Sequence, residues 1–317
     1  RVGRKRIVIP SLIVYAVAGS ACAAAPSFGI LLVLRTLQGF GASALTSLSV
    51  TLIGDMYEDE RRNAAVGYNA SVLSIGTAAY PAIGGLLASV SWKLPFLLSA
   101  FGLPVGIAAL LWLHSPRPEK RGTALAHLAS VVRHAWRSGI VVLFLLGLFQ
   151  FVLLYGAYLT YVPFLLEQRF AATSLTVGLL MSTMSAATAV VASRHKALAR
   201  RFTTRTLVMI AFSSVMLSLF FFSVVPDLAL VPVATVLYGT GQGIIIPSIQ
   251  GTIAARSPLE LRGATMSVNA MAIRIGQTLG PLFTGLIYSL GGIVSVFRIT
   301  AALALCMIAV TAASLSS

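Results

Sequence analysis

Charged side chains are scarce in this chain, and acidic ones are the scarcest. Of its 317 residues only 10% are charged, with 8 aspartates and glutamates against 23 lysines and arginines. A soluble globule of this length needs a much larger polar surface than these residues supply. Hydrophobic residues make up 57% of the chain, and its mean hydropathy is +0.92. The composition therefore predicts an integral membrane protein.

Residue types that bind metals or catalyse reactions are also few. The two cysteines, Cys22 and Cys306, lie inside apolar runs, which provides neither a disulfide framework nor a metal cluster. The sequence has no paired carboxylates, no glycine-rich phosphate loop and no metal-ligand spacing. The histidines fall between the apolar runs, and we expect all of them to be solvated: His114, His127, His134 and His195. We therefore expect no enzyme activity, no metal and no cofactor.

Ten apolar runs are long enough to cross a bilayer as helices, since about 20 residues make one span. We place them at residues 7–25, 28–54, 63–90, 93–113, 140–166, 174–193, 206–225, 228–253, 264–289 and 293–313. The turns between them alternate between basic and nearly neutral, and most lysines and arginines fall in the basic set. The positive-inside rule places the basic turns in the cytoplasm. The net charge of +15 thus has a topological cause and requires no nucleic-acid partner.

The two halves of the chain repeat one another. Shifting the sequence by 200 residues without a gap aligns many identical residues. The aligned pairs include Asn69 with Asn269, Gly76 with Gly276, Pro81 with Pro281 and Gly85 with Gly285. Such self-similarity over a long stretch indicates two copies of one structural unit.

The repeat also predicts the domain organisation. We expect residues 1–113 to form four helices of a first bundle, residues 114–139 a cytoplasmic linker, and residues 140–317 a second bundle of six helices. The two helices between residues 140 and 200 have no counterpart in the first copy. We therefore expect two further helices before Arg1, in a parent protein of twelve helices arranged as two pseudo-symmetric bundles of six.

One glycine-rich stretch, residues 67–85, is expected to act as a hinge and a packing surface. In a helix buried in lipid, small residues let a neighbouring backbone approach closely, and a proline is tolerated. The residues concerned are Gly67, Gly76, Pro81, Gly84 and Gly85 in the first copy, and Gly280 and Pro281 in the second.

Three motifs carry a resemblance to a known family. They are Arg1-Val2-Gly3-Arg4-Lys5-Arg6, then Leu32-x-x-Arg35-x-x-Gln38-Gly39-x-Gly41-Ala42, and finally Gly67, Gly76, Tyr80-Pro81 and Gly84-Gly85. With these motifs the chain resembles the major facilitator superfamily and, within it, the twelve-helix drug:proton antiporter branch. The family has glycine where this sequence has Tyr80. A tyrosine there would hold a neighbouring helix further away or turn its ring into a cavity.

The resemblance implies a secondary transporter that works by alternating access, in which two bundles rock about a midplane site. It implies export of small lipophilic compounds, as in multidrug resistance, in exchange for protons. It also implies a cytoplasmic gate formed by Gly3, Arg4 and Lys5 with Asp55 and Arg62. Two alternatives stay open, namely a carrier of an anionic or neutral metabolite and a membrane fragment that does not transport.

Two arginines are expected within the membrane, where such a charge is costly and usually functional. Arg35 lies about 10 Å deep and Arg274 about 15 Å deep, at about 1.5 Å per helical residue. Each could couple to a proton or bind substrate, or it could snorkel or hold helix-end carbonyls. Other residues expected to line the cavity are Gln38, Gln150, Tyr155 and Asn269. Asn69 and Asn269, as repeat equivalents, are expected to form interhelical hydrogen bonds.

No carboxylate is expected at a buried position, because all eight fall in or beside loops. A proton-coupled carrier needs a group whose pKa shifts on burial or beside a charge. We therefore expect the proton acceptor on helices before Arg1. The partners we expect are a small-molecule substrate, protons and membrane lipid. The protein is expected to be a monomer that spans a prokaryotic inner membrane several times.

Overall fold

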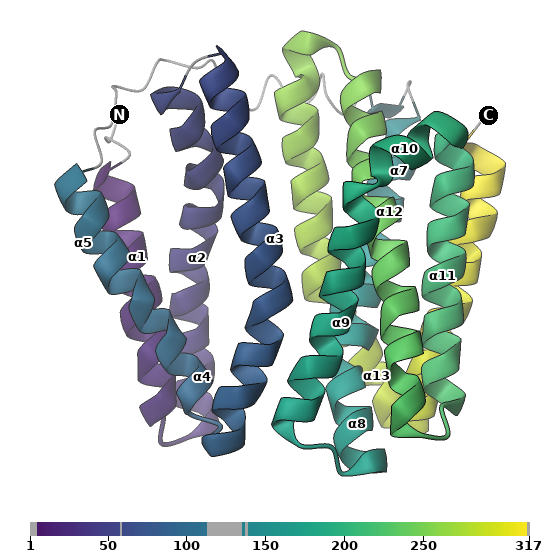
Figure 1. The fold of residues 1–317 in the computed structure, drawn as a ribbon, viewed down its shortest axis with the longest axis horizontal. Coiled ribbons are helices and arrows are strands. Elements are labelled where there is room, and N and C mark those ends of the chain that lie inside the picture. The colour runs from purple at the N-terminus through teal and green to yellow at the C-terminus, as the bar shows by residue number, and fades with distance from the viewer. Residues whose placement is uncertain (1–4, 58, 113–134, 137–138, 316–317) are drawn as a thin grey trace. The chain divides into compact units, whose positions relative to one another are not determined.

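The computed structural model describes residues 5–57, 59–112, 135–136 and 139–315 (Figure 1). The chain divides into two compact units, residues 1–121 and residues 122–317, which we call unit 1 and unit 2. Every regular element among the described residues is a helix. The expected linker of residues 114–139 lies outside the described residues, apart from Ala135, Trp136 and Gly139.

Unit 1 contains three long helices and one broken one. Helix α1 (Lys5–Ala21) ends in a short 3₁₀ turn and is followed by α2 (Phe28–Met56) and α3 (Asp59–Val90). The last span is assembled from α4 (Leu94–Leu97), η2 (Leu98–Phe101) and α5 (Gly102–Trp112). Helix α1 packs along both α2 and α5, whereas α3 makes few contacts, mainly with α2 and α4.

Unit 2 begins with one span made of three segments. Helix α7 (Ile140–Val152) continues as a π-helix, η3 (Leu153–Tyr161), and then as α8 (Val162–Phe170). The next elements are α9 (Ser174–Ser193), the short α10 (His195–Arg201), α11 (Thr204–Val224), η4 (Leu228–Leu230) and α12 (Val231–Arg256). The unit ends with α13 (Leu259–Ser314).

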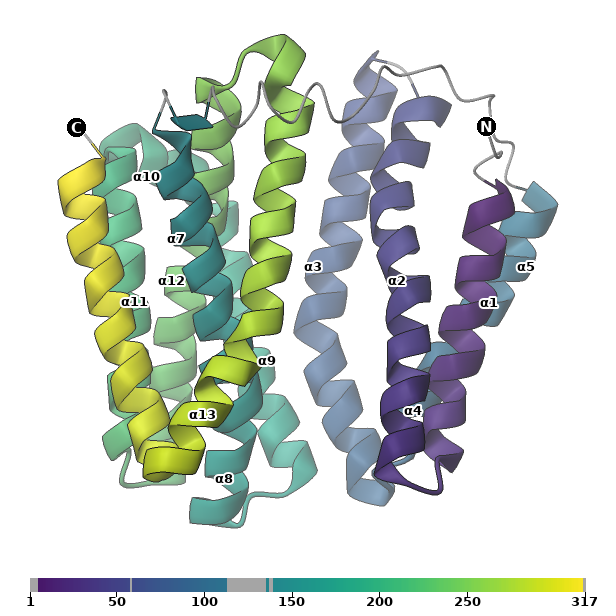
Figure 2. The same cartoon turned by 180° about the vertical axis from the view of Figure 1, so that it is seen from behind.

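Helix α13 is two spans joined end to end. At Gly292 the backbone leaves the helical region, with φ 70° and ψ −173°, a conformation that glycine adopts easily. Figures 1 and 2 show the helix turning at one end of unit 2 and returning beside α11, with which it makes extensive contact. The break at Gly292 separates the two spans that the sequence predicts at residues 264–289 and 293–313.

Polar side chains define where several helices begin. The hydroxyl oxygens of Ser27, Thr173 and Thr203 accept hydrogen bonds from the backbone N–H three residues later, at the starts of α2, α9 and α11. Each bond satisfies a backbone donor that would otherwise lack a partner in the first turn. These three helices start within a few residues of the positions expected from the apolar runs.

The described helices have the length and composition of membrane spans. Nine helical segments qualify, and the last of them, Leu259–Ser314, is 56 residues long and contains the break at Gly292. Hydropathy in these segments reaches 2.5 in Ile140–Phe170. The predicted fold class, an all-α membrane protein, is confirmed.

The two units use one repeat-related contact between helices. A Cβ at Gly41 of α2 would lie 2.7 Å from the carbonyl oxygen of Ser11 in α1, and a Cβ at Gly241 of α12 would lie 2.6 Å from the carbonyl oxygen of Ala211 in α11. Gly241 and Ala211 lie 200 positions after Gly41 and Ser11, respectively. Only glycine permits such an approach. The sequence repeat therefore corresponds to a repeated packing contact.

Aromatic rings fill the centre of unit 2. Tyr158 of η3 lies 4.4 Å from Tyr238 of α12 between ring centroids, and it meets Phe222 of α11 edge to face at 6.0 Å. Phe222 in turn stacks on Phe297 of α13 at 5.5 Å. Aromatic pairs at these separations stabilise a core beyond the area they bury. The cluster joins three of the spans of unit 2 to the π-helix.

Candidate functional site

Arg35 in unit 1 is held by a chain of polar contacts. Its Nη1 donates to Oε1 of Gln38 at 2.9 Å, and Nε2 of Gln38 donates to Oγ of Ser99 in η2 at 2.8 Å. The guanidinium also lies over the ring of Phe96, 4.8 Å from the centroid, in a cation–π contact. Gln38 is buried, whereas Arg35 is exposed on unit 1. The structure thus brings together two of the residues expected from the sequence and adds Ser99 and Phe96.

Arg274 in unit 2 has a similar local arrangement. Its Nη1 donates to Oε1 of Gln277 at 3.0 Å, and the side chain is exposed on unit 2. In both units an arginine is therefore oriented by a glutamine amide oxygen three residues later. These two pairs are not repeat equivalents, because 274 and 35 do not differ by 200. An amide neutralises no charge, so each guanidinium keeps its full positive charge for another partner.

The amide side chains of Gln150 and Asn269 line a narrow cleft in unit 2, and Gln242 contacts Gln150. Gln150 of α7 donates a short hydrogen bond to Oε1 of Gln242 in α12, and Asn269 of α13 borders the same cleft as Gln150. Gln250 also lines the cleft, and its remaining walls are apolar: Gly147, Phe151, Ile245, Ile246, Ile249 and Ile273. Gln150 and Asn269 are almost fully buried, at 1% and 2% exposure. The cleft has a volume of about 10 Å³, which is room for about one water molecule, so a larger ligand would require these helices to separate.

Two acceptors in this group have no hydrogen-bond partner among the described residues. They are Oε1 of Gln150 and Oδ1 of Asn269. The interhelical hydrogen bond expected for Asn269 is thus not formed through this oxygen. Leaving a buried acceptor unpaired costs about 1–3 kcal/mol. Both oxygens would therefore gain from a donor supplied by a water molecule or a ligand.

Tyr155 lies in the π-helix and is not among the residues that line the cleft. Its ring packs against Phe151, with centroids 6.2 Å apart, and its backbone carbonyl accepts a hydrogen bond from Thr160 Oγ1 at 2.7 Å. The acceptor is five residues before the donor, which is the spacing of a π-helix turn. Such turns are frequent at functional sites. Tyr155 is partly buried.

The two glycine-rich stretches are packed differently. In unit 2, a Cβ at Gly280 would lie 2.9 Å from the backbone nitrogen of Gly156 and 2.9 Å from the carbonyl oxygen of Val152. Helix α13 thus contacts η3 and α7 backbone to backbone, just before Pro281. In unit 1, a Cβ at Gly67 or Gly84 would meet no atom within 4 Å among the described residues.

Tyr80 occupies the space beside Gly76. A Cβ at Gly76 would lie 3.1 Å from the Tyr80 ring of the same helix, and the tyrosine is exposed. The ring thus folds back over the glycine. Pro81 follows within α3, and Gly85 one turn later is buried. The role of these residues as a hinge stays a prediction.

The expected cytoplasmic gate lies mostly outside the described residues. Gly3 and Arg4 fall outside them, and Lys5 is the first residue of α1. Asp55 and Arg62 belong to α2 and α3, but their side chains are not among those described. The gate therefore stays a prediction.

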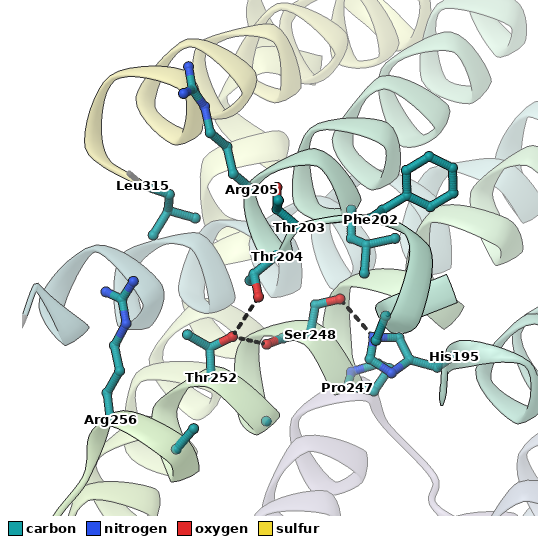
Figure 3. Close-up of a pocket in the computed structure, with 14 residues that line it drawn as sticks. His195, Phe202, Thr203, Thr204, Arg205, Pro247, Ser248, Thr252, Arg256 and Leu315 are labelled. Atoms are coloured by element: carbon teal, nitrogen blue, oxygen red, sulfur yellow. Dashed lines mark hydrogen bonds between the residues drawn. The ribbon is translucent and has the colours of Figure 1, made fainter. Parts of the chain in front are cut away.

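One pocket was not expected from the sequence. It has a volume of about 570 Å³ and lies at the end of unit 2 where α10 and α11 begin and α12 ends (Figure 3). His195 lines it, and its Nε2 lies 2.9 Å from Oγ of Ser248. His195 is partly buried against α12, so the expectation that it is a solvated surface residue holds only in part. The other three histidines lie outside the described residues.

Comparisons with known proteins agree with these observations. A model of the Major Facilitator Superfamily matches residues 1–228 and 166–316. The uncharacterized transporter YebQ of Escherichia coli is 31% identical over 152 residues, which cover 47% of this chain and 33% of that protein. The multidrug transporter protein MdtP of Bacillus subtilis is 29% identical over 112 residues, covering 35% of this chain and 20% of that protein. The chain thus aligns with a third or less of the length of these relatives.

A solved structure shows the same fold. A mutant of the nucleoside transporter NupG superposes with a TM-score of 0.81 at 13% identity, over 99% of this chain and 84% of that one. At this identity the likeness concerns the arrangement of helices alone. The match of the family model covers both units and includes all three motifs that the sequence analysis identified. The chain belongs to the Major Facilitator Superfamily.

Proposed function

We propose that the protein is a secondary transporter that exports small lipophilic compounds in exchange for protons. Membership of the superfamily supports transport, and the similarity to MdtP, which is named a multidrug transporter, supports lipophilic substrates. The mechanism would be alternating access between two helix bundles. In this proposal residues 1–113 and 140–317 belong to the two bundles, with residues 114–139 as the linker.

The amide cleft of unit 2 is the observation that carries this proposal. Gln150 lies ten residues beyond the start of α7, and Asn269 ten residues beyond the start of α13. At 1.5 Å per residue both side chains are about 15 Å from the starts of their helices, and, counted in the same way from Leu259, Arg274 lies about 22 Å along α13 rather than about 15 Å. Isoleucines and a phenylalanine form the walls, and the unpaired oxygens of Gln150 and Asn269 can accept from a substrate donor. If the cleft, whose volume is about 10 Å³ in this structure, widens during the transport cycle, its lining would suit a molecule with a large apolar surface and a few donors.

Arg35 and Arg274 are proposed to provide the electrostatic coupling. Each guanidinium is oriented by an amide, so its charge is available to a carboxylate that gains or loses a proton. A nearby positive charge lowers the pKa of a carboxyl group, and movement of the arginine would raise it again. Protonation and rearrangement of the helices would thus be linked through these side chains.

The proposed orientation places the basic turns in the cytoplasm of a prokaryotic cell, with the protein as a monomer in the inner membrane. The contact of Gly280 with Gly156 would let the span containing Pro281 move against the π-helix. On the cytoplasmic side, Gly3, Arg4, Lys5, Asp55 and Arg62 would close the transporter in one of its states.

Substitution of the cleft amides tests the proposal. Gln150→Leu and Asn269→Leu keep the size of the side chain but remove the acceptors. We expect each to reduce uptake of a fluorescent lipophilic cation into inverted vesicles by about tenfold, because one hydrogen bond to a charged group is worth about 1.5–3 kcal/mol. The matched control is Gln168→Leu, since Gln168 is exposed at the end of α8. Transport by both cleft variants at the control rate, with equal protein in the membrane, would refute this site.

A further inference from the structure

The pocket beside His195 is distinct from the amide cleft and shares none of its residues. Its lining comes from the start of α11, the last turns of α12, the short α10, and Leu315 after the end of α13. All of these segments lie at the same end of unit 2. A volume of about 570 Å³ is within the range of 300–1,000 Å³ found for small-molecule pockets.

A row of hydroxyl groups crosses the middle of the pocket. Oγ1 of Thr252 donates to the carbonyl oxygen of Ser248 at 2.8 Å and lies 3.3 Å from Oγ1 of Thr204. Oγ of Ser248 lies 2.9 Å from Nε2 of His195. Figure 3 shows these groups between the two sides of the pocket. The row links α10, α11 and α12 and places hydroxyl and imidazole groups where a polar ligand would contact them.

The charge of the pocket is positive. Arg205 and Arg256 lie on the Leu315 side, and His195 lies on the opposite side (Figure 3). No residue that lines the pocket is acidic among those described. Arg256 already has an interaction within the protein, so Arg205 and the hydroxyl groups form the set of donors that favours an anion.

The dipole of helix α11 also favours an anion in this pocket. The 21-residue helix α11 begins at Thr204, so the positive end of its dipole faces the pocket. Thr203 already caps one backbone N–H of the first turn, at Thr206. An anion near Arg205 would therefore gain from the helix terminus as well as from the Arg205 guanidinium. The helix terminus adds to a site that the pocket and its side chains already form.

We propose that this pocket binds a phosphate-bearing anion. The phosphoryl group would contact Arg205, and Thr252 and Ser248 would contact the polar part attached to it. Bound in this way, the ligand connects the start of α11 to the end of α12 and restrains these two spans. The phosphoryl group can belong to the head group of an anionic phospholipid or to a soluble phosphate ester, because the contacts are the same.

Ligand-induced stabilisation of the purified protein tests this proposal. The unfolding temperature is measured in neutral detergent with inorganic phosphate, with phosphatidylglycerol, and with sodium chloride at matched ionic strength. Native mass spectrometry on the same samples counts bound phospholipid. The variants are Arg205→Gln and Thr252→Ala, and the control is Arg262→Gln, an exposed arginine on α13 that does not line the pocket.

We expect a phosphate-bearing probe to raise the unfolding temperature of the unmodified protein and of Arg262→Gln more than chloride does. Arg205→Gln should bind that probe about tenfold more weakly, since a charge-assisted hydrogen bond is lost. Stabilisation by phosphatidylglycerol alone identifies a lipid head group, and stabilisation by inorganic phosphate identifies a soluble ligand. If Arg205→Gln does not fold, the affinity of Thr252→Ala decides. Equal stabilisation of the pocket variants and the control, or none beyond that by chloride, would overturn the proposal.

Discussion

The backbone contact at Gly280 makes a sharp prediction about packing. Replacing Gly280 with alanine puts a methyl group 2.9 Å from the nitrogen of Gly156 and 2.9 Å from the oxygen of Val152. Both neighbours are backbone atoms, which cannot rotate away as a flexible side chain would. Helix α13 must therefore move away from η3 by several tenths of an ångström. The same helix provides a control, because a Cβ at Gly285 would meet no atom within 4 Å among the described residues.

The size of the effect follows from two opposing terms. Alanine is favoured over glycine inside a helix by about 0.5–1 kcal/mol, and this gain applies to both positions. Overpacking at Gly280 costs about 1–3 kcal/mol. Because both variants have the same gain in helix propensity, it cancels when their free energies of unfolding are compared. Gly280→Ala should thus be less stable than Gly285→Ala by about 1–3 kcal/mol.

Unfolding of the purified variants by denaturant in mixed micelles measures this difference. We expect Gly285→Ala to match or exceed the unmodified protein in stability, and Gly280→Ala to fall below it. The transport rate should fall with Gly280→Ala as well, if α13 moves against η3 during the cycle. Equal stability of the two variants would refute the backbone contact.

Two further predictions concern a titrating group and a buried hydroxyl. Burial lowers the pKa of His195 below its ordinary value of 6.5, so the folded protein resists protonation there and its stability falls as the pH drops below 6.5. His195→Gln should reduce the loss of unfolding temperature between about pH 7.5 and about pH 5.5, and an unchanged loss would show that His195 does not contribute. The hydroxyl oxygen of Tyr238 is buried and has no hydrogen-bond partner among the described residues. Tyr238→Phe should therefore leave the unfolding temperature unchanged or raise it. Tyr238→Ala, by comparison, should lose about 3–5 kcal/mol of stability. A drop for Tyr238→Phe as large as that for Tyr238→Ala would reveal a partner for the hydroxyl.

The fold could be predicted because its signals are local in the sequence. The length of each apolar run predicted a membrane span. The helices that Ser27, Thr173 and Thr203 cap start near the expected positions. The break at Gly292 separates two spans of expected length. The close contact of Gly280 agrees with the packing role expected for small residues in lipid.

The candidate sites were only partly predictable, because they depend on contacts between distant residues. Gln150 and Gln242 are 92 positions apart, and His195 and Ser248 are 53 apart. No local pattern in the sequence indicated these pairs. Ser248 and Thr252 do lie one turn apart on α12, and polar residues at that spacing beside a basic turn are a signal that could have suggested the pocket. The π-helix of Leu153–Tyr161 had no such signal.

Proton-linked transport by the purified protein in liposomes tests the central claim most directly. A lipophilic dye is loaded, a pH gradient is imposed, and dye movement and internal pH are recorded together. We predict that dye movement follows the direction of the proton gradient and that adding dye causes protons to move across the membrane. Dye transport that is indifferent to the gradient would contradict proton exchange, and the arginines would then be candidates for binding an anionic substrate.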